Sequence, residues 1–218
     1  MRFSVGEYQI ELAPIEREDM PQFVQDGGMQ SRIVSRYLGR SGTAPVLEDE
    51  YEWFDATRSD QNSRAWGIYV ISGDQRLLIG NTSINSITEG VMSHGCTGFL
   101  IFRPEYWGKG IASHCHRART WFGCTQMGLV QLRSGVFDGN EGSKKALERV
   151  GYLPIFHERN QHFVDGVFVG LTSFSLINPL NVQWNLWWHG ETVPPEFKAA
   201  RRRTRAALKW ANTHLELG

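Results

Sequence analysis

The spacing of apolar residues changes along this chain, and the changes predict a mixture of strands and helices. Gly98–Phe102 is a short apolar run of the kind that forms a buried strand, and Val130–Val136 alternates like a strand. Between these two runs, from Ile111 to Gly123, apolar residues recur at helical spacing. A strand, a helix and a second strand in this order indicate an α/β fold.

The N-terminal part predicts two helices followed by a pair of strands. Asp19 is expected to cap the first helix, and Val46–Thr57 is expected to form the second. Gly39–Pro45 has the composition of a mobile linker. Trp66–Ile71 and Leu77–Ile87 are expected to pair as strands around a short turn.

The C-terminal segment combines three tryptophans with a basic helix. Pro195 starts a helix that is expected to run to Asn212. Its apolar face consists of Phe197, Ala200, Thr204, Ala207, Leu208 and Ala211, and its opposite side carries Lys198, Arg201, Arg202, Arg205 and Lys209.

Both features of this segment have a structural and a functional interpretation. Trp184, Trp187 and Trp188 either dock the segment onto the body or form an acceptor pocket or a stacking platform for bases. The basic side of the helix is either a solvated face or a surface for an acidic acceptor or nucleic acid. We favour docking and a solvated face.

A turn with two glycines lies between the apolar strand and the helix that follows it. Gly108 and Gly110 let the backbone approach a ligand closely, and the N–H groups of the first helical turn point at that ligand. The spacing excludes a P-loop, and Ser113 stands where a Rossmann turn has its third glycine. The turn therefore indicates a phosphate or pyrophosphate site, although a glycine-rich turn without a ligand remains the alternative.

The downstream sequence resembles the GNAT superfamily of N-acetyltransferases, and within it the RimJ/RimL-like branch. The branch's turn and helix correspond to Phe102–Ala112, and its later motif corresponds to Asn140, Ser143, Leu147 and Gly151–Tyr152. Further similar segments are Ile10–Asp19, Leu77–Ile84, His162–Gly166 and Leu171–Leu176. The resemblance spans roughly residues 8 to 178.

This resemblance implies a GNAT fold, a mixed and strongly twisted sheet flanked by helices, with acetyl-CoA bound where central strands part. The expected domain is 1–178, with 179–218 as an extension packed on it. Asn140 would hydrogen-bond the pantetheine, Ser143 would lie near the thioester sulfur, and Leu100, Ile101 and Phe102 would pair with the pantetheine as an edge strand does. The pyrophosphate would rest on the turn formed by Glu105, Tyr106, Trp107, Gly108, Lys109, Gly110, Ile111 and Ala112.

The resemblance also implies catalytic residues, and here the chain departs from its relatives. Leu147 stands where some members carry a tyrosine acid, so Ser143 is the candidate acid, with a helix cap as its alternative role. His162 stands where relatives carry a glutamate base, eleven residues after Gly151, and imidazole can accept an amine proton. A merely packed strand histidine is the alternative. Gly170 and His114 replace two further acidic residues of the family.

Composition adds bounds on partners and location. Residues 1–100 carry 14 acids against 8 bases and the remainder 9 against 15, so the C-terminal half fits a polyanionic cofactor. Cys96, Cys115 and Cys124 form no disulfide or zinc pattern, and Cys96 and Cys115 are expected to be buried thiols. His114 and His116 would diverge on their helix, so no metal is expected. Without a signal peptide or membrane span, we expect a cytoplasmic protein.

The sequence therefore predicts an acetyl-CoA-dependent N-acetyltransferase that acts on a primary amine, with a protein or peptide amine favoured over a small molecule. Two other hypotheses remain: a non-catalytic acyl-CoA-binding module, and a nucleic-acid-associated acetyltransferase guided by the basic tail. A homodimer is also left open.

Overall fold

One eight-stranded sheet organises the chain in the computed structural model, which describes residues 1–25, 28–38, 44–181 and 183–218. The strand order is β1-β2-β3-β4-β5-β6-β8-β7, and every neighbouring pair is antiparallel except β5 and β6. The strands are β1 (Arg2–Val5), β2 (Tyr8–Ala13), β3 (Arg64–Ser72), β4 (Gln75–Thr88), β5 (His94–Ile101), β6 (Gln131–Phe137), β7 (Leu153–Val164) and β8 (Val167–Ile177). The predicted mixed sheet and its strand pair are thereby confirmed.

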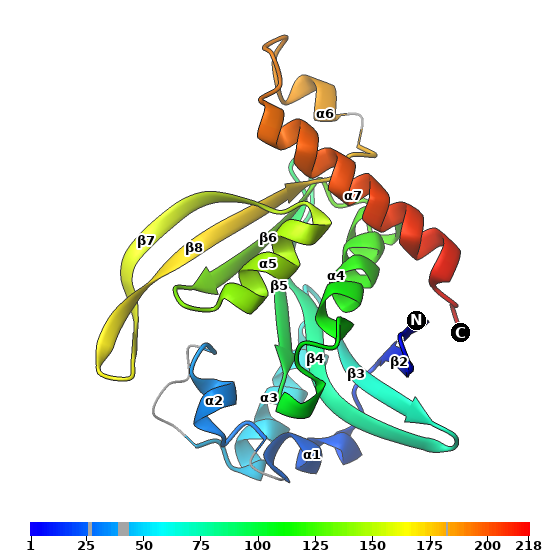
Figure 1. The fold of residues 1–218 in the computed structure, drawn as a ribbon, viewed down its shortest axis with the longest axis vertical. Coiled ribbons are helices and arrows are strands. Elements are labelled where there is room, and N and C mark those ends of the chain that lie inside the picture. The colour runs from blue at the N-terminus through cyan, green and yellow to red at the C-terminus, as the bar shows by residue number, and fades with distance from the viewer. Residues whose placement is uncertain (26–27, 39–43, 182) are drawn as a thin grey trace.

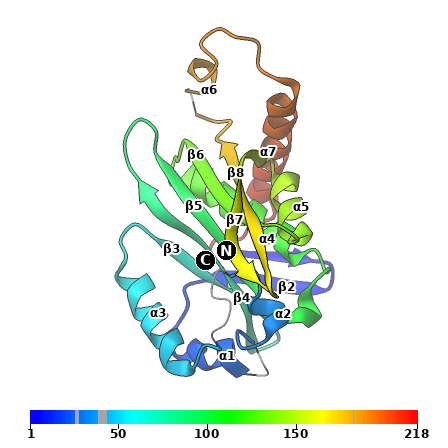
Figure 2. The same cartoon turned by 90° about the vertical axis from the view of Figure 1, so that its left-hand side faces the viewer.

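Helices cover the sheet on both sides, with α3 on one side and α4, α5 and α7 on the other (Figures 1 and 2). One apolar cluster joins α1, α2 and α3 to the sheet, and two others lie under α4, α5 and α7. The helices are α1 (Met20–Val24), α2 (Arg32–Ser35), α3 (Leu47–Ser59), α4 (Ile111–Trp121), α5 (Glu141–Val150), α6 (Gln183–Leu186) and α7 (Pro195–His214). Each described helix is too short or too polar to cross a membrane.

The parallel pair β5 and β6 separates after three residue pairs. Their ladder runs from His94 and Gln131 to Cys96 and Arg133. One step further, Thr97 Oγ1 donates to the Arg133 carbonyl (3.0 Å), and Ser134 Oγ donates to the Thr97 carbonyl (3.2 Å). Beyond this point β5 continues to Ile101 and β6 to Phe137, and the two strands no longer pair with each other. The sheet therefore opens between two adjacent strands, and this opening positions the site described below.

Helix α7 is part of the hydrophobic core. Its predicted apolar face is confirmed at five positions, Ala200, Thr204, Ala207, Leu208 and Ala211, which are all buried, whereas Phe197 is only half-buried. Thr204 Oγ1 donates to the Val150 carbonyl at the end of α5 (3.0 Å), and Trp121 Nε1 of α4 donates to Asn212 Oδ1 (2.6 Å).

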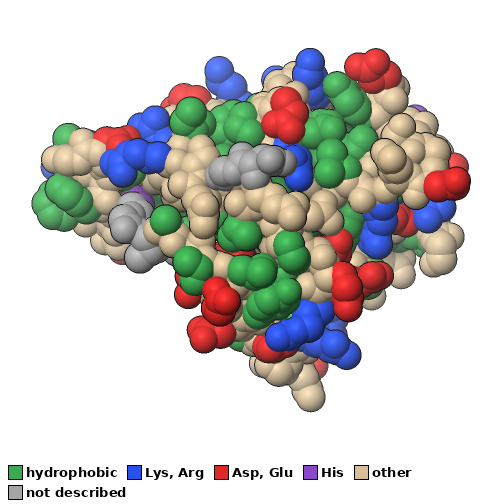
Figure 3. Space-filling view, turned by 90° about the horizontal axis from the view of Figure 1, so that it is seen from below, with side chains coloured by type: hydrophobic (Ala, Val, Ile, Leu, Met, Phe, Trp, Pro, Cys, Tyr) green, Lys and Arg blue, Asp and Glu red, His purple; other side chains and the backbone are tan. Residues whose placement is uncertain are grey.

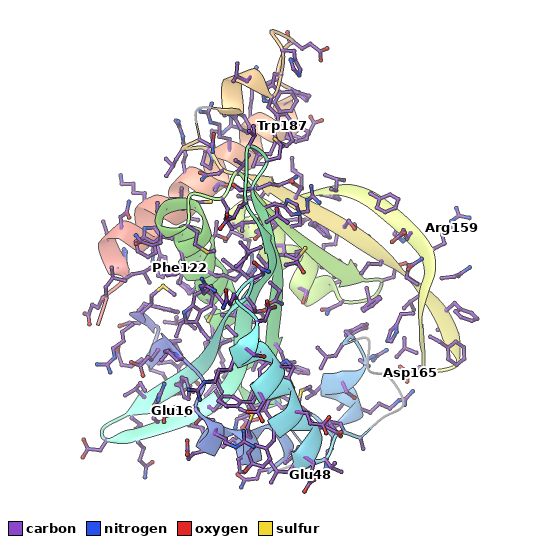
Figure 4. The ribbon with its side chains drawn as sticks, turned by 180° about the vertical axis from the view of Figure 1, so that it is seen from behind. Glu16, Glu48, Phe122, Arg159, Asp165 and Trp187 are labelled. Atoms are coloured by element: carbon purple, nitrogen blue, oxygen red, sulfur yellow. The ribbon has the colours of Figure 1, made fainter. Side chains whose placement is uncertain are left out.

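Figure 4 labels Trp187 of the extension, and two further tryptophans, Trp184 and Trp188, contact α7. Trp184 is buried with the Arg201 guanidinium 4.5 Å from its ring, and Trp188 meets Phe197 edge to face at 4.8 Å. These contacts join the tryptophans to α7 within the extension, so their docking onto residues 1–178 stays a prediction.

Two local expectations turn out differently, and a third falls mostly outside the described residues. Asp19 occupies the N-cap position of α1, but its side chain makes no capping bond, because its carboxylate accepts from the Glu16 N–H (2.9 Å) and the Tyr69 hydroxyl (2.5 Å) instead. Cys115 is buried as expected, whereas Cys96 is exposed, since strand alternation buries its neighbour Gly95 and turns Cys96 outward. Most of the linker expected at Gly39–Pro45 (residues 39–43) lies outside the described residues.

Candidate functional site

A groove of about 630 Å³ occupies the opening between β5 and β6. Its two strand walls are Phe99–Ile101 and Gly135–Phe137, and the segment Ile33–Leu38 closes it on the side of α2. The remaining lining residues come from the glycine turn with α4 and from the start of α5: Tyr106, Trp107, Gly108, Gly110, Ile111, Ala112, Ser113, His116, Asn140, Gly142, Ser143, Lys145, Ala146 and Arg149.

The N-terminus of α4 lies at this groove. Gly110 precedes the helix with φ of 84° and ψ of −7°, a left-handed conformation that glycine adopts without strain. No side chain caps the helix, so the first-turn N–H groups remain available to an anion. Trp107 holds the turn against β5, because its Nε1 donates to the Ile101 carbonyl (2.9 Å).

Basic side chains line the groove, and one of them, Arg149, donates to Ser113 Oγ in the first turn of α4 (3.3 Å). Arg36, Lys145 and Arg149 line it, and the described lining residues include no carboxylate. The charge therefore suits a polyphosphate. Sequence reasoning missed all three cations. Lys145 and Arg149 are four residues apart on one helix that begins beside Asn140, so a helical projection would have found them.

The predicted strand edge is only partly open to a ligand. Leu100 and Ile101 line the groove, but Phe102 is 1% exposed and packs on Phe23 with ring centroids 4.8 Å apart. The Phe102 N–H donates to the Ile79 carbonyl (3.0 Å), and the Ile101 carbonyl is already bonded to Trp107. An added strand would thus have to pair nearer Phe99 and Leu100. Glu105 and Lys109 are exposed and lie outside the lining.

Asn140 and Ser143 come together at the start of α5, where both line the groove. Asn140 is the N-cap, since its Oδ1 accepts from the Ser143 backbone N–H (3.2 Å). The alternative that Ser143 caps this helix is therefore wrong, because Asn140 performs that role. This bond uses the Asn140 side-chain oxygen and the Ser143 backbone N–H, so it does not involve the Asn140 amide nitrogen or the Ser143 hydroxyl.

His162 lies behind the groove rather than in its lining. Its ring stacks on Phe137, with centroids 4.5 Å apart, and Phe137 is itself a lining residue. The Nε2 atom of His162 is buried, with no hydrogen-bond partner among the described residues. The structure thus brings Asn140 and Ser143 into the groove and connects His162 to it through Phe137.

A second set of hollows follows α3 on the other side of the sheet. Three adjoining hollows of about 1170, 340 and 180 Å³ all include Trp53 in their walls, and we call them together the α3 trench. Its inner end is lined by Phe99 and Leu100, which also line the groove. The trench and the groove therefore meet across β5.

The wall of the α3 trench carries both signs of charge. Its acidic members are Glu16, Glu18, Glu50, Asp60 and Glu89, and its basic members are Arg17, Arg58 and Arg64. Glu50 lies at the inner end and is 2% exposed. Seen from below, the molecular surface likewise shows hydrophobic patches between charged side chains of both signs (Figure 3).

The histidines considered as metal ligands are separated by the helix. His114 Nδ1 contacts the Gly110 carbonyl (2.9 Å), whereas His116 is buried against Phe99. Burial lowers the pKa of His114, and burial together with Arg119 holds the pKa of His116 well below its ordinary value. The part of the chain that the structure describes contains no group of three or more residues suited to a metal ion.

Comparison with known proteins gives consistent matches. A family model described as an acetyltransferase (GNAT) domain matches residues 9–153. "Probable N-acetyltransferase YjcK" of Bacillus subtilis is 26% identical over 114 residues, which are 52% of this chain but only 61% of that protein.

Solved structures match over most of their length. Spermidine N-acetyltransferase from Vibrio cholerae, in complex with CoA and spermine, has a TM-score of 0.68 at 18% identity and covers 78% of this chain and 95% of its own. Mycobacterium smegmatis RimJ, in complex with CoA-disulfide, has a TM-score of 0.73 at 14% identity, and the match covers 95% of this chain and 93% of the RimJ chain. At these identities the likeness shows the fold alone.

Proposed function

The chain belongs to the acetyltransferase (GNAT) family, and on that premise we propose that it transfers an acetyl group from acetyl-CoA to a primary amine. The observation that carries the proposal is the groove between β5 and β6, with an uncapped helix N-terminus and three cations in its lining. A pyrophosphate suits those N–H groups and cations, while the open strand edge suits an extended amide-bearing arm.

Residues along the groove then bind successive parts of acetyl-CoA and assist the departure of the thiolate. The pyrophosphate binds at the Gly108 to Ala112 turn, and the pantetheine follows Phe99–Ile101 toward the closed end of the groove, where β5 and β6 begin to pair. Asn140 donates to the pantetheine through its amide, because its oxygen already serves as the helix cap. Ser143 supplies the proton or hydrogen bond that the departing thiolate needs.

The acceptor amine reaches the thioester through the α3 trench. The trench meets the groove at Phe99 and Leu100, so a ligand in it approaches the acyl group from the side opposite CoA. Its length favours an extended acceptor, and its mixture of carboxylates and guanidinium groups favours a peptide over a uniformly cationic polyamine. We therefore propose a protein or peptide amine as the acceptor.

Mass spectrometry of products tests the function. The protein is incubated with acetyl-CoA and a panel of peptides with a free N-terminus, peptides with only lysine amines, polyamines and amino sugars. A gain of one acetyl group on a peptide N-terminus is the expected result. Acetyl-CoA binding by calorimetry without product from any amine would instead support a non-catalytic module.

Trp53→Ala is expected to weaken acceptor binding without affecting the cofactor. Trp53 lies in the wall of all three hollows of the α3 trench and outside the groove lining. Removing its ring should raise KM for the amine by roughly 10-fold or more, as truncation of an aromatic contact typically does. Calorimetry should give an unchanged acetyl-CoA Kd. A normal amine KM in this variant would remove the trench from the acceptor path.

His162→Ala is expected to lower turnover by roughly 100-fold if His162 receives the amine proton. Imidazole added to the assay should restore part of the rate, because it can replace the missing base. His157→Ala is a matched control, since His157 lies on the same strand but pairs with Asp138 (3.1 Å). Equal turnover in the two variants and the wild type would leave His162 a packing residue behind Phe137.

A further inference from the structure

A buried arginine and a histidine meet at the closed end of the groove. Arg119 of α4 is fully buried, and its Nη1 donates to Thr82 Oγ1 (2.9 Å) and to the Gly98 carbonyl (2.7 Å). Its Nη2 lies 2.7 Å from His116 Nδ1. Gly98 is two residues beyond Cys96, the last residue of β5 that pairs with β6. Arg119 therefore fixes the point from which the strands part.

The arginine also determines the tautomer of His116. A guanidinium group has only donors, so His116 Nδ1 must be the acceptor and cannot carry a proton. Burial and the adjacent charge both lower the pKa of His116, so the ring is neutral. A neutral imidazole with an unprotonated Nδ1 carries its proton on Nε2, which makes Nε2–H the donor that this side chain can offer a ligand.

The ring is held in place at the groove. His116 is 3% exposed, yet it is one of the lining residues, and it packs on Phe99 with ring centroids 4.6 Å apart. The positive charge of Arg119 lies behind Nδ1, and all three acceptors named for that guanidinium are neutral groups. A cation on one side of an imidazole polarises the N–H on the other side and strengthens it as a donor.

We propose that His116 Nε2–H donates a hydrogen bond to the acetyl carbonyl oxygen of acetyl-CoA, with Arg119 as the positioning residue behind it. This inference rests on the proposed function. The amine nitrogen bonds to the acetyl carbon, and the C=O electron pair moves onto the oxygen, whose negative charge the Nε2–H then stabilises. On collapse, the electron pair on the oxygen re-forms C=O and the C–S bond breaks. The sulfur leaves as a thiolate with the electron pair of the C–S bond, and the ammonium proton is released to a base.

Two substitutions test the two ring nitrogens of His116 separately. In His116→Asn, the side-chain oxygen can take the place of Nδ1 and accept from Arg119, but nothing replaces the Nε2 donor. In His116→Gln, the amide NH2 can take the place of Nε2, but the acceptor for Arg119 is lost. The first variant should therefore melt close to the wild type, and the second should melt at a lower temperature, since a buried guanidinium donor is left without its partner.

Acetyl-CoA binding and turnover should depend on whether a variant keeps a donor at the Nε2 position, and not on its melting temperature. CoA lacks the acetyl carbonyl, so His116→Asn should bind acetyl-CoA roughly 3- to 10-fold more weakly, the effect of one hydrogen bond, while its Kd for CoA is unchanged. Its turnover should fall on the order of 100-fold, as for loss of one oxyanion donor. His116→Gln should keep the wild-type ratio of the two Kd values and part of the turnover per folded molecule.

The outcomes distinguish this inference from the function on which it rests. Wild-type turnover and an unchanged ratio of Kd values in a folded His116→Asn would overturn the role of His116 and leave the acetyltransferase proposal intact. If His116→Asn does not fold, His116→Gln provides the test. A His116→Gln protein that has no turnover, and whose two Kd values differ no more than in a groove without a donor for the acetyl carbonyl, would overturn the role of His116 equally. A wild-type protein that binds neither CoA nor acetyl-CoA would remove the function itself.

Discussion

Gly110→Glu is expected to weaken the binding of acetyl-CoA on the order of 100-fold. The wild-type Kd should be on the order of micromolar. The new carboxylate would stand at the N-cap of α4, where its charge satisfies the first-turn N–H groups and repels the pyrophosphate. At a separation of about 5 Å near a protein surface, one pair of like charges costs about 3 kcal/mol, which weakens binding on the order of 100-fold. Calorimetry with acetyl-CoA measures the effect.

Gly110→Ala is the matched control for this variant. Both side chains must adopt the left-handed conformation at φ of 84°, at a cost of about 1 to 2 kcal/mol in stability. The space itself is open, since the nearest atom to an added Cβ is Val5 Cγ1 at 3.6 Å. Alanine therefore adds the strain without the charge. Comparable acetyl-CoA affinity in the glutamate variant and the wild type would show that the pyrophosphate binds elsewhere.

Ser143→Ala is expected to lower turnover by roughly 10- to 1000-fold, the range for loss of one acid or hydrogen-bond donor. The interaction strengthens only as charge develops on the sulfur, so the acetyl-CoA Kd should barely change. Steady-state kinetics and calorimetry on the same preparation separate the two quantities.

Ser143→Ala should leave the start of α5 intact. The bond at the start of α5 runs from the Ser143 backbone N–H to Asn140, and alanine keeps that N–H. The free energy of unfolding should therefore change by only about 0.5 kcal/mol, as for a substitution away from a cap or a core. Ser143→Thr retains a hydroxyl and should recover part of the rate. Full activity in Ser143→Ala would assign the leaving-group proton to water or another residue.

Local signals along the chain predicted much of this architecture. The strand, glycine turn and helix around Gly110 follow from periodicity and from glycine's conformational range, both of which act over a few residues. The buried face of α7 follows from helical spacing. Asn140 belongs to a recognisable motif, and its capping bond reaches only three residues along the chain.

Other features depend on residues far apart in sequence. The pattern in α3 places Leu47, Tyr51 and Phe54 on one face, yet Glu50 is buried as well, at the inner end of the trench. The position of α2 beside the groove also depends on a segment far away in the sequence. Arg32 and Arg36 pair with Asp165, which lies at the tip of the hairpin of β7 and β8 (Figure 4). Neither arrangement has a local sequence signal.

The sequence by itself determined the order of elements, the anion turn and the family to which the chain is similar, because short-range periodicity and backbone preferences set these. Only the tertiary structure decided which side chains face the opening between β5 and β6. Phe102 follows the end of β5 and packs on Phe23 in the core, outside the groove lining. The fold brings Thr82 and Gly98 to Arg119, which then orients His116. A histidine's role depends on what bonds to each ring nitrogen, and those partners come together only when the chain folds.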